Sequence, residues 1–153
     1  MSALELKIPP VLLTALFAVL MWLISHVTPS ITSWSSFRIP SLLMFTAAGA
    51  LVGLAGVAAF RKAGTTVNPL SPDASSSLVI TGIFTRTRNP MYLALLLVLI
   101  GWGLYLANLL SLVVTAGFVV YMNRFQIQPE ECALETQFGD SFIKYRRSVR
   151  RWI

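Results

Sequence analysis

Residues 91–122, MYLALLLVLIGWGLYLANLLSLVVTAGFVVYM, contain no charged side chain and decide the fold class. About 20 apolar residues are enough for a helix to cross the roughly 30 Å hydrocarbon core of a bilayer. Asn108 lies near the middle of the stretch, which suits a tight helical hairpin. We therefore expect two membrane spans, 90–107 and 109–125. The uncharged run of the second span is the shorter one, and we expect this span to extend to about Phe125.

Two further apolar stretches, 11–27 and 41–60, precede this hairpin. The whole chain is 56% apolar and only 12% charged, which is more apolar and less charged than the composition of soluble domains. Helices are expected because a helix satisfies its backbone hydrogen bonds internally in lipid, and a soluble bundle would need polar helix faces that these stretches lack. We predict an all-α polytopic membrane protein, with about four transmembrane helices in one integral membrane domain over 1–153.

The distribution of charge predicts the orientation in the membrane. With four spans, both termini and the loop 61–89 share one side, and that side carries every basic residue except Arg38. The positive-inside rule then places the termini and this loop in the cytoplasm. A secretory signal peptide is not expected, because Glu5 offsets Lys7 and no small-residue cleavage pattern follows the first apolar stretch.

The chain contains one cysteine, Cys132, and one histidine, His26. This composition supports neither a disulfide framework nor a zinc site, and we expect no metal. His26 lies near the outer end of the first span and is interpreted as an interfacial side chain. No nucleic-acid partner is expected for a chain of this class.

The loop 61–89 is the first of two polar regions expected on the cytoplasmic side. Its segments Gly64–Pro69 and Ser71–Ser77 have the composition of turns. They would suit a solvated linker. The apolar residues Leu78–Ile80 that follow favour instead a loop folded back onto the membrane face.

This loop ends in two arginines, Arg86 and Arg88, directly before Asn89 and Pro90. Pro90 suits the first turn of the third span, and Asn89 can cap it. Cations, however, are disfavoured at a helix N-terminus. Either the arginines anchor the chain at the membrane surface, or one of them is held there to meet a carboxylate or a developing anion.

The tail 123–153 is the second polar region. Apolar residues recur along it at helical spacing: Leu134, Phe138, Phe142, Tyr145, Val149 and Trp152. With basic residues on the remaining surface, the tail could lie as an amphipathic helix on an anionic leaflet. We expect cytoplasmic helices within 129–152, opened by Pro129 and divided at Gly139.

Two adjacent acids, Glu130 and Glu131, follow Pro129. They could stabilise the first turn of a helix through its dipole. They are also suited to pairing with Arg86 and Arg88, or to accepting hydrogen bonds from the amine and ribose hydroxyls of a ligand.

These segments together resemble the integral-membrane methyltransferases that include the isoprenylcysteine carboxyl methyltransferases and the phospholipid methyltransferases. No single motif is specific; their order and spacing carry the resemblance over residues 64–152. The motifs are Gly64-Thr-Thr-Val-Asn-Pro69, Gly82-Ile-Phe84 with Arg88-Asn-Pro-Met-Tyr92, Glu130-Glu131, Leu134, Phe138-Gly139, Tyr145 and Val149-Arg-Arg-Trp152.

The resemblance implies methyl transfer from S-adenosylmethionine to a lipophilic small molecule or lipid that enters from the bilayer. It implies cofactor contacts from Arg88, Asn89, Pro90, Tyr92, Glu130, Glu131 and Tyr145. It implies catalytic roles for Arg88, Glu131 and Arg151, with an arginine to orient a carboxylate acceptor, or Glu131 to deprotonate an amine, thiol or phenol. Asn89 stands where many members have histidine, so no imidazole is available at that position.

Two other interpretations remain open from the sequence. The tail is loosely similar to the C-terminal region of membrane sterol reductases, which would imply NADPH as the cofactor. Gly49 and Gly53 form a Gly-x-x-x-Gly pair, which would suit a non-catalytic scaffold or a homodimer, although such pairs also pack helices within one chain.

Overall fold

A computed structural model describes residues 6–64 and 77–153. All regular structure within these residues is helical, which confirms the prediction of an all-α polytopic membrane protein. The predicted turn segments Gly64–Pro69 and Ser71–Ser77 lie outside the described residues, apart from Gly64 and Ser77. The elements are α1 (Pro10–Val27), the 3-10 helix η1 (Thr32–Phe37), α2 (Arg38–Ala63), the 3-10 helix η3 (Gly82–Thr85), α3 (Pro90–Leu106), α4 (Leu109–Tyr121), the π-helical turn η4 (Met122–Ile127), α5 (Gln128–Phe138) and α6 (Asp140–Ser148).

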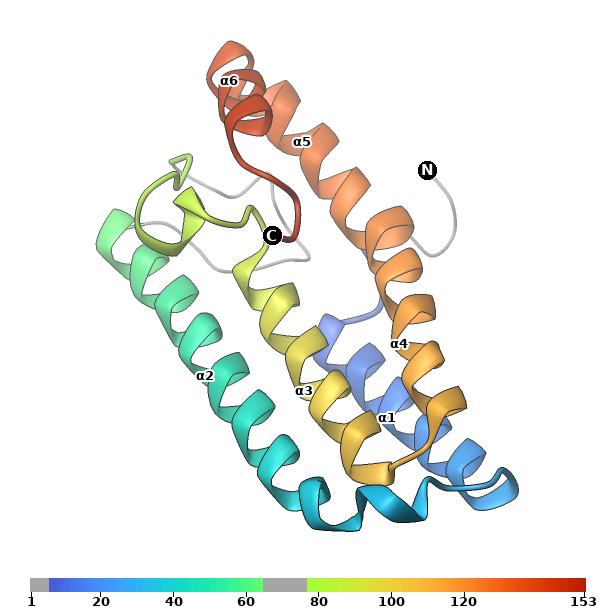
Figure 1. Cartoon of the computed structure of the whole chain (residues 1–153). Coiled ribbons are helices and arrows are strands. Elements are labelled where there is room, and N and C mark those ends of the chain that lie inside the picture. Colours follow the sequence, from blue (N-terminus) through green and yellow to red (C-terminus); the bar gives the residue numbers. More distant parts are fainter. Residues whose placement is uncertain (1–5, 65–76) are drawn as a thin grey trace.

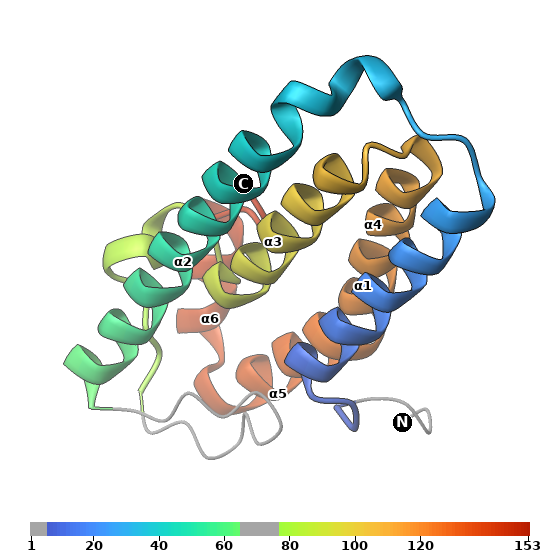
Figure 2. The same ribbon diagram turned by 90° about the horizontal axis from the view of Figure 1, so that it is seen from below.

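Helix α3 is the central element of the bundle (Figures 1 and 2). It packs against α2 on one side and against α1 and α4 on the other. The end of α2, the beginning of α3 and both C-terminal helices lie at one end of the bundle, and η1 and the α3–α4 turn lie at the other. The two polar regions of the sequence therefore meet at the same end.

Within residues 6–64 and 77–153, three helical stretches are long and apolar enough to cross a membrane: Pro10–Val27, Ser33–Ala63 and Leu109–Phe138. Helix α3, with 17 residues, is the shorter apolar helix. The fourth stretch continues past the end of α4, as the predicted bounds 109–125 imply, because α4 runs without a break through η4 into α5. Since about 20 residues suffice to cross the bilayer, we expect a crossing that starts at Leu109 to end near Ile127, with α5 beyond it.

Pro129 lies in the first turn of α5, as predicted, and the π-helical turn η4 joins α5 to α4 without a break. A proline inside an α-helix clashes with the carbonyl four residues earlier, here that of Phe125. A π turn bonds residue i to residue i+5 and so relieves this conflict. The Phe125 carbonyl instead accepts a hydrogen bond of 3.1 Å from the Leu6 N–H. A contact distant in sequence thus satisfies the backbone at this point.

The turn between α3 and α4 is as tight as the sequence predicts. Ala107 has a positive φ of 51°, and the Asn108 side chain accepts a hydrogen bond from the Ser111 N–H. The Asn108 amide also donates to the Thr28 hydroxyl at 2.7 Å, which ties this turn to the end of α1.

The glycines of α2 bring it close to α3. A Cβ atom on Gly49 would lie 2.8 Å from the Ala94 carbonyl oxygen, and one on Gly53 would lie 3.3 Å from the Ala94 Cβ. Small residues permit this approach between membrane helices. The Gly-x-x-x-Gly pair is therefore used within the chain.

Candidate active site

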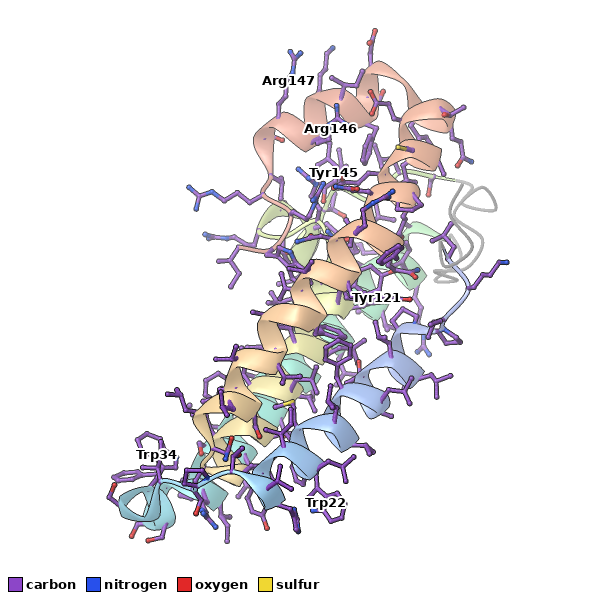
Figure 3. The ribbon with its side chains drawn as sticks, turned by 90° about the vertical axis from the view of Figure 1, so that its right-hand side faces the viewer. Trp22, Trp34, Tyr121, Tyr145, Arg146 and Arg147 are labelled. Carbon is purple, nitrogen blue, oxygen red and sulfur yellow. The ribbon has the colours of Figure 1, made fainter. Side chains whose placement is uncertain are left out.

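The predicted site residues come together where the start of α3, helix α5 and the C-terminal segment meet. Figure 3 shows Tyr145 and Arg146 at this end of the molecule, with the arginine side chain of Arg147 directed away from the bundle. Trp22 and Trp34 lie at the opposite end, where aromatic side chains commonly mark a membrane interface.

Arg88 is at the centre of the site. Its Nη2 atom donates to Glu131 Oε1 at 2.7 Å, and its Nη1 atom donates to the carbonyl oxygens of Arg146 and Val149, each at 2.7 Å. The side chain is only 10% exposed. Its Nε atom is buried and has no hydrogen-bond partner among the described residues. Arg88 thus holds the end of α6 against α5 and keeps one donor unused.

Glu131 bridges two arginines. Besides Arg88, it accepts hydrogen bonds from Arg151, from Nη2 to Oε2 at 2.6 Å and from Nε to Oε1 at 3.2 Å. Burial acts to raise the pKa of Glu131, but the hydrogen bonds and charges of Arg151 and Arg88 outweigh it and hold the pKa below its ordinary value. Glu131 is therefore a carboxylate at neutral pH.

Glu130 has a different environment, although it is adjacent. Its Oε2 atom accepts a hydrogen bond of 2.9 Å from the Tyr92 hydroxyl, which in turn accepts one of 3.3 Å from the Gln126 amide. Burial and the nearby Glu131 carboxylate raise the pKa of Glu130 to about 7, against the Tyr92 hydrogen bond. Glu130 therefore titrates close to neutral pH.

The C-terminal segment is fastened to residues 87–89. The Arg88 N–H donates to the Arg150 carbonyl at 3.0 Å, and the Thr87 hydroxyl donates to the Arg151 carbonyl at 3.3 Å. The Asn89 amide also donates to the Arg151 carbonyl, at 3.0 Å. The predicted capping role of the Asn89 side chain is therefore wrong, because the amide bonds the tail instead of the first turn of α3.

Pro90, the first residue of α3, and Arg86, which precedes the helix, have different surroundings. Pro90 is buried and lies in the first turn of α3, the position that the sequence predicts for it. Arg86 is exposed and forms no ion pair with the described part of the chain. Of the two arginines expected to meet the glutamates, only Arg88 does so.

Tyr145 is buried in a second cluster with Phe84, Val79 and Phe142. Its hydroxyl donates to the Phe84 carbonyl at 2.8 Å, and burial raises its pKa above the ordinary value. The apolar face of α6 is thus covered by the segment 78–84, so α6 does not lie free on a leaflet with that face in lipid. The predicted division of the tail at Gly139, which has a φ of 52°, is confirmed.

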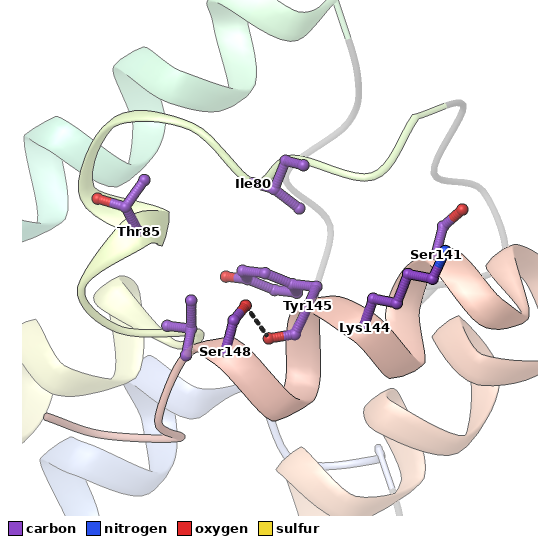
Figure 4. Close-up of a pocket in the computed structure, with 7 residues that line it drawn as sticks. Ile80, Thr85, Ser141, Lys144, Tyr145 and Ser148 are labelled. Atoms are coloured by element: carbon purple, nitrogen blue, oxygen red, sulfur yellow. Dashed lines mark hydrogen bonds between the residues drawn. The ribbon is translucent and has the colours of Figure 1, made fainter.

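A cavity of about 690 Å³ adjoins Tyr145 (Figure 4). It lies between the segment that carries Ile80 and Thr85 and the face of α6 that carries Lys144 and Ser148. Among the described residues, no group of three or more His, Cys, Asp or Glu side chains could hold a metal ion.

Sequence reasoning did not assign roles to Asn123 and Gln126, which are part of the site. Asn123 Oδ1 accepts from the Trp152 indole at 3.1 Å and from Arg151 Nη1 at 3.5 Å. The signal that could have identified Asn123 and Gln126 is the occurrence of two polar side chains at the end of an apolar helix.

Comparison with known proteins identifies one family. The model of the family described as phospholipid methyltransferase matches residues 38–141, more than half of the chain. An uncharacterized protein of Haemophilus influenzae is 46% identical over 63 residues, which are 41% of this chain and 100% of that protein. No solved structure matches the chain at a significant level.

Proposed function

Because the chain belongs to the phospholipid methyltransferase family, we propose that it transfers a methyl group from S-adenosylmethionine to a lipophilic or lipidated acceptor. Membership of the family implies methyl transfer to a lipid-related substrate. The observation that carries the finer proposal is the buried cluster of Arg88, Glu131 and Arg151 at the polar end of the bundle.

The side chains present fit the polar groups of S-adenosylmethionine, which are a carboxylate, an ammonium and ribose hydroxyls. Arg88 Nε is a buried donor without an acceptor in the described part of the chain, and a carboxylate would satisfy it. Glu130 and Glu131 supply carboxylate oxygens for an ammonium or for hydroxyls. We propose that Arg88, Asn89, Pro90, Tyr92, Glu130, Glu131 and Tyr145 hold the cofactor, with Tyr145 at the border of the neighbouring cavity.

The protein would contribute to the reaction mainly by positioning the acceptor and by excluding water from the site. S-adenosylmethionine, when bound, supplies a methyl group that is already activated by the sulfonium. The protein then has to hold the acceptor in line and keep water out. Arg151, with its side chain 29% exposed, is the more accessible of the two site arginines and is suited to orient the acceptor.

We propose that the site faces the cytoplasm. Arg61 and Lys62 at the end of α2, Arg124 and the basic residues of α6 lie at the same end of the bundle as the site, whereas Arg38 begins α2 at the other end. The positive-inside rule then gives cytoplasmic termini. A lipophilic acceptor would reach the site from the surrounding bilayer.

Calorimetric titration of the purified protein in detergent with S-adenosylmethionine tests the proposal. We expect binding by the wild type and a loss of roughly tenfold or more, about 1.4 kcal/mol, for Arg88→Ala and Glu131→Ala. Glu135→Ala is the matched control, because Glu135 also pairs with an arginine on α6 but is 38% exposed. Its affinity should stay near that of the wild type.

Two results of these titrations would contradict the proposal. A wild-type protein that binds no S-adenosylmethionine, or that binds NADPH in its place, would rule the proposal out. Equal affinities for the wild type, Arg88→Ala and Glu131→Ala would show that the cluster is not the binding site.

A further inference from the structure

The two adjacent glutamates of α5 are not equivalent. Both oxygens of Glu131 are occupied by guanidinium groups, from Arg88 at 2.7 Å and from Arg151 at 2.6 Å. Glu130 forms no ion pair among the described residues, and its only hydrogen-bond partner there is the Tyr92 hydroxyl on Oε2. A carboxylate that is neutralised by two cations is a poor proton acceptor, whereas Glu130 keeps Oε1 available.

Glu130 also has a fixed orientation. Tyr92 is buried, and its hydroxyl is held between Glu130 and the buried Gln126 amide. This chain of hydrogen bonds runs from η4 through α3 to α5. It fixes one oxygen of Glu130 and leaves the other without a partner in the described part of the chain.

The position of this chain suits an acceptor that comes from the bilayer. Tyr92 belongs to the apolar cluster between the membrane helices, together with Leu99, Phe118, Met122 and Ile127. Glu130 is hydrogen-bonded to this apolar cluster through Tyr92, and the next residue, Glu131, is bonded to the arginines. A lipophilic molecule bound against the apolar cluster could therefore reach Glu130.

We propose that Glu130, oriented by Tyr92, accepts the proton that the methyl acceptor loses. The acceptor is then a nucleophile that carries a proton, such as an amine, a thiol or a phenol, and not a carboxylate, which needs no base. This inference rests on the proposed methyl transfer. It assigns the proton to Glu130, whereas the sequence resemblance pointed to Glu131.

The proton balance is simple. The lone pair of the acceptor forms the new bond to the methyl carbon, while the carbon–sulfur bond breaks and its electron pair stays on sulfur. The proton of the acceptor moves to Glu130 Oε1 and leaves later to water. The charged and titratable groups around Glu130 are Tyr92 on α3, Glu131 on its own helix, and Arg88 and Arg151, which are both paired with Glu131. A pKa of about 7 lets the Glu130 carboxylate take up and release a proton near neutral pH.

The test compares Glu130→Gln, Glu130→Asp and Glu131→Gln in the full chain. Membranes of cells that produce each protein are supplied with S-adenosylmethionine carrying a labelled methyl group, and the lipid product is treated with mild alkali. We expect no labelled methanol after alkali, because methyl esters release methanol and methylated amines, thioethers and aryl ethers do not. We expect Glu130→Gln to lose roughly 100-fold or more in rate, in the range of general base catalysis, and Glu130→Asp to recover part of it.

Two further measurements separate a proton role from a structural one. Glu130→Gln should lose far more in rate than in affinity for S-adenosylmethionine, because glutamine keeps an oxygen that can accept a hydrogen bond, whereas Glu131→Gln should bind the cofactor weakly. Infrared difference spectra of the protein without cofactor should show a carboxyl carbonyl band that titrates near pH 7 and is missing in Glu130→Gln.

Several results would overturn this inference while leaving methyl transfer intact. They are labelled methanol after alkali, an unchanged rate in Glu130→Gln, a loss of cofactor binding in Glu130→Gln as large as in Glu131→Gln, or an infrared band that is still present in Glu130→Gln. A wild type that does not bind S-adenosylmethionine contradicts the proposed function itself and this inference with it.

Discussion

Glu131 and Glu135 offer a direct test of how the site is held together. Both lie on α5, and each accepts a hydrogen bond of 2.6 Å from an arginine of the C-terminal segment or of α6. They differ in burial: the Glu131 side chain is 11% exposed and that of Glu135 is 38% exposed. Glu131→Gln leaves Arg88 and Arg151 facing each other without a counter-charge, whereas Glu135→Gln leaves only Arg146, which water can reach.

The expected difference in stability follows from burial. Removing one partner of a buried pair costs about 3–5 kcal/mol, and an exposed pair contributes about 0–1 kcal/mol. Glutamine keeps an acceptor oxygen, so we expect about 3 kcal/mol for Glu131→Gln. At about 2–4 °C per kcal/mol for a chain of this size, the midpoint of thermal unfolding falls by about 6–12 °C, against at most about 4 °C for Glu135→Gln.

Intrinsic tryptophan fluorescence of the detergent-solubilised proteins during heating provides the assay. Circular dichroism at low temperature verifies that both variants start from the same helical content. Equal shifts for the two variants would refute the reasoning, because they would mean that the Glu131 carboxylate is as well solvated as that of Glu135.

Three other outcomes can be checked with the same unfolding assay. Gly49→Ala should destabilise the protein by about 1–3 kcal/mol, because its Cβ would lie 2.8 Å from a backbone oxygen of α3. Gly117→Ala should be neutral or stabilising, because the nearest contact of its Cβ is at 3.6 Å. The reverse order of stabilities would contradict the close packing of α2 on α3. Gly139→Ala should cost about 1–3 kcal/mol, since a φ of 52° with a ψ of −127° is a conformation that only glycine adopts easily, and an unchanged midpoint would argue against this turn. The raised pKa of Glu130 makes a contribution to stability that is fully present below its ordinary value of 4.5 and is lost as the pH rises through about 7. The unfolding midpoint of the wild type should therefore fall over that window relative to Glu130→Gln, and parallel pH curves would exclude a raised pKa.

The helical hairpin and the spans were predictable because their signals are local. An uncharged stretch of spanning length has few alternatives to a helix, and Asn108 marks the turn through its own side chain. Gly139 divides the tail because its backbone needs a positive φ. The meeting of Arg88 with Glu131 was also expected, from the order of the motifs.

The errors arose where distant contacts outweigh local preference. Asn89 before a proline is typical of a helix cap, but the Arg151 carbonyl, 62 positions later, takes its amide. Pro129 and the two acids mark the start of α5, but they do not indicate that the distant Leu6 N–H satisfies the Phe125 carbonyl that the proline leaves free. The spacing of Glu130 and Glu131 also gives no sign that one is paired with arginines and the other with a tyrosine.

The π turn at Met122–Ile127 has a consequence for the rotational phase of the long helix. One such turn contains an extra residue, and each residue of an α-helix advances the side-chain direction by about 100°. A helical wheel drawn straight through from Leu109 to Phe138 therefore assigns the wrong faces beyond Ile127. Scanning thiol reactivity along this helix would give two periodic patterns offset by one position. The π turn thus lets the residues before it face the other membrane helices, while Glu130 and Glu131 after it face Tyr92 and the arginines.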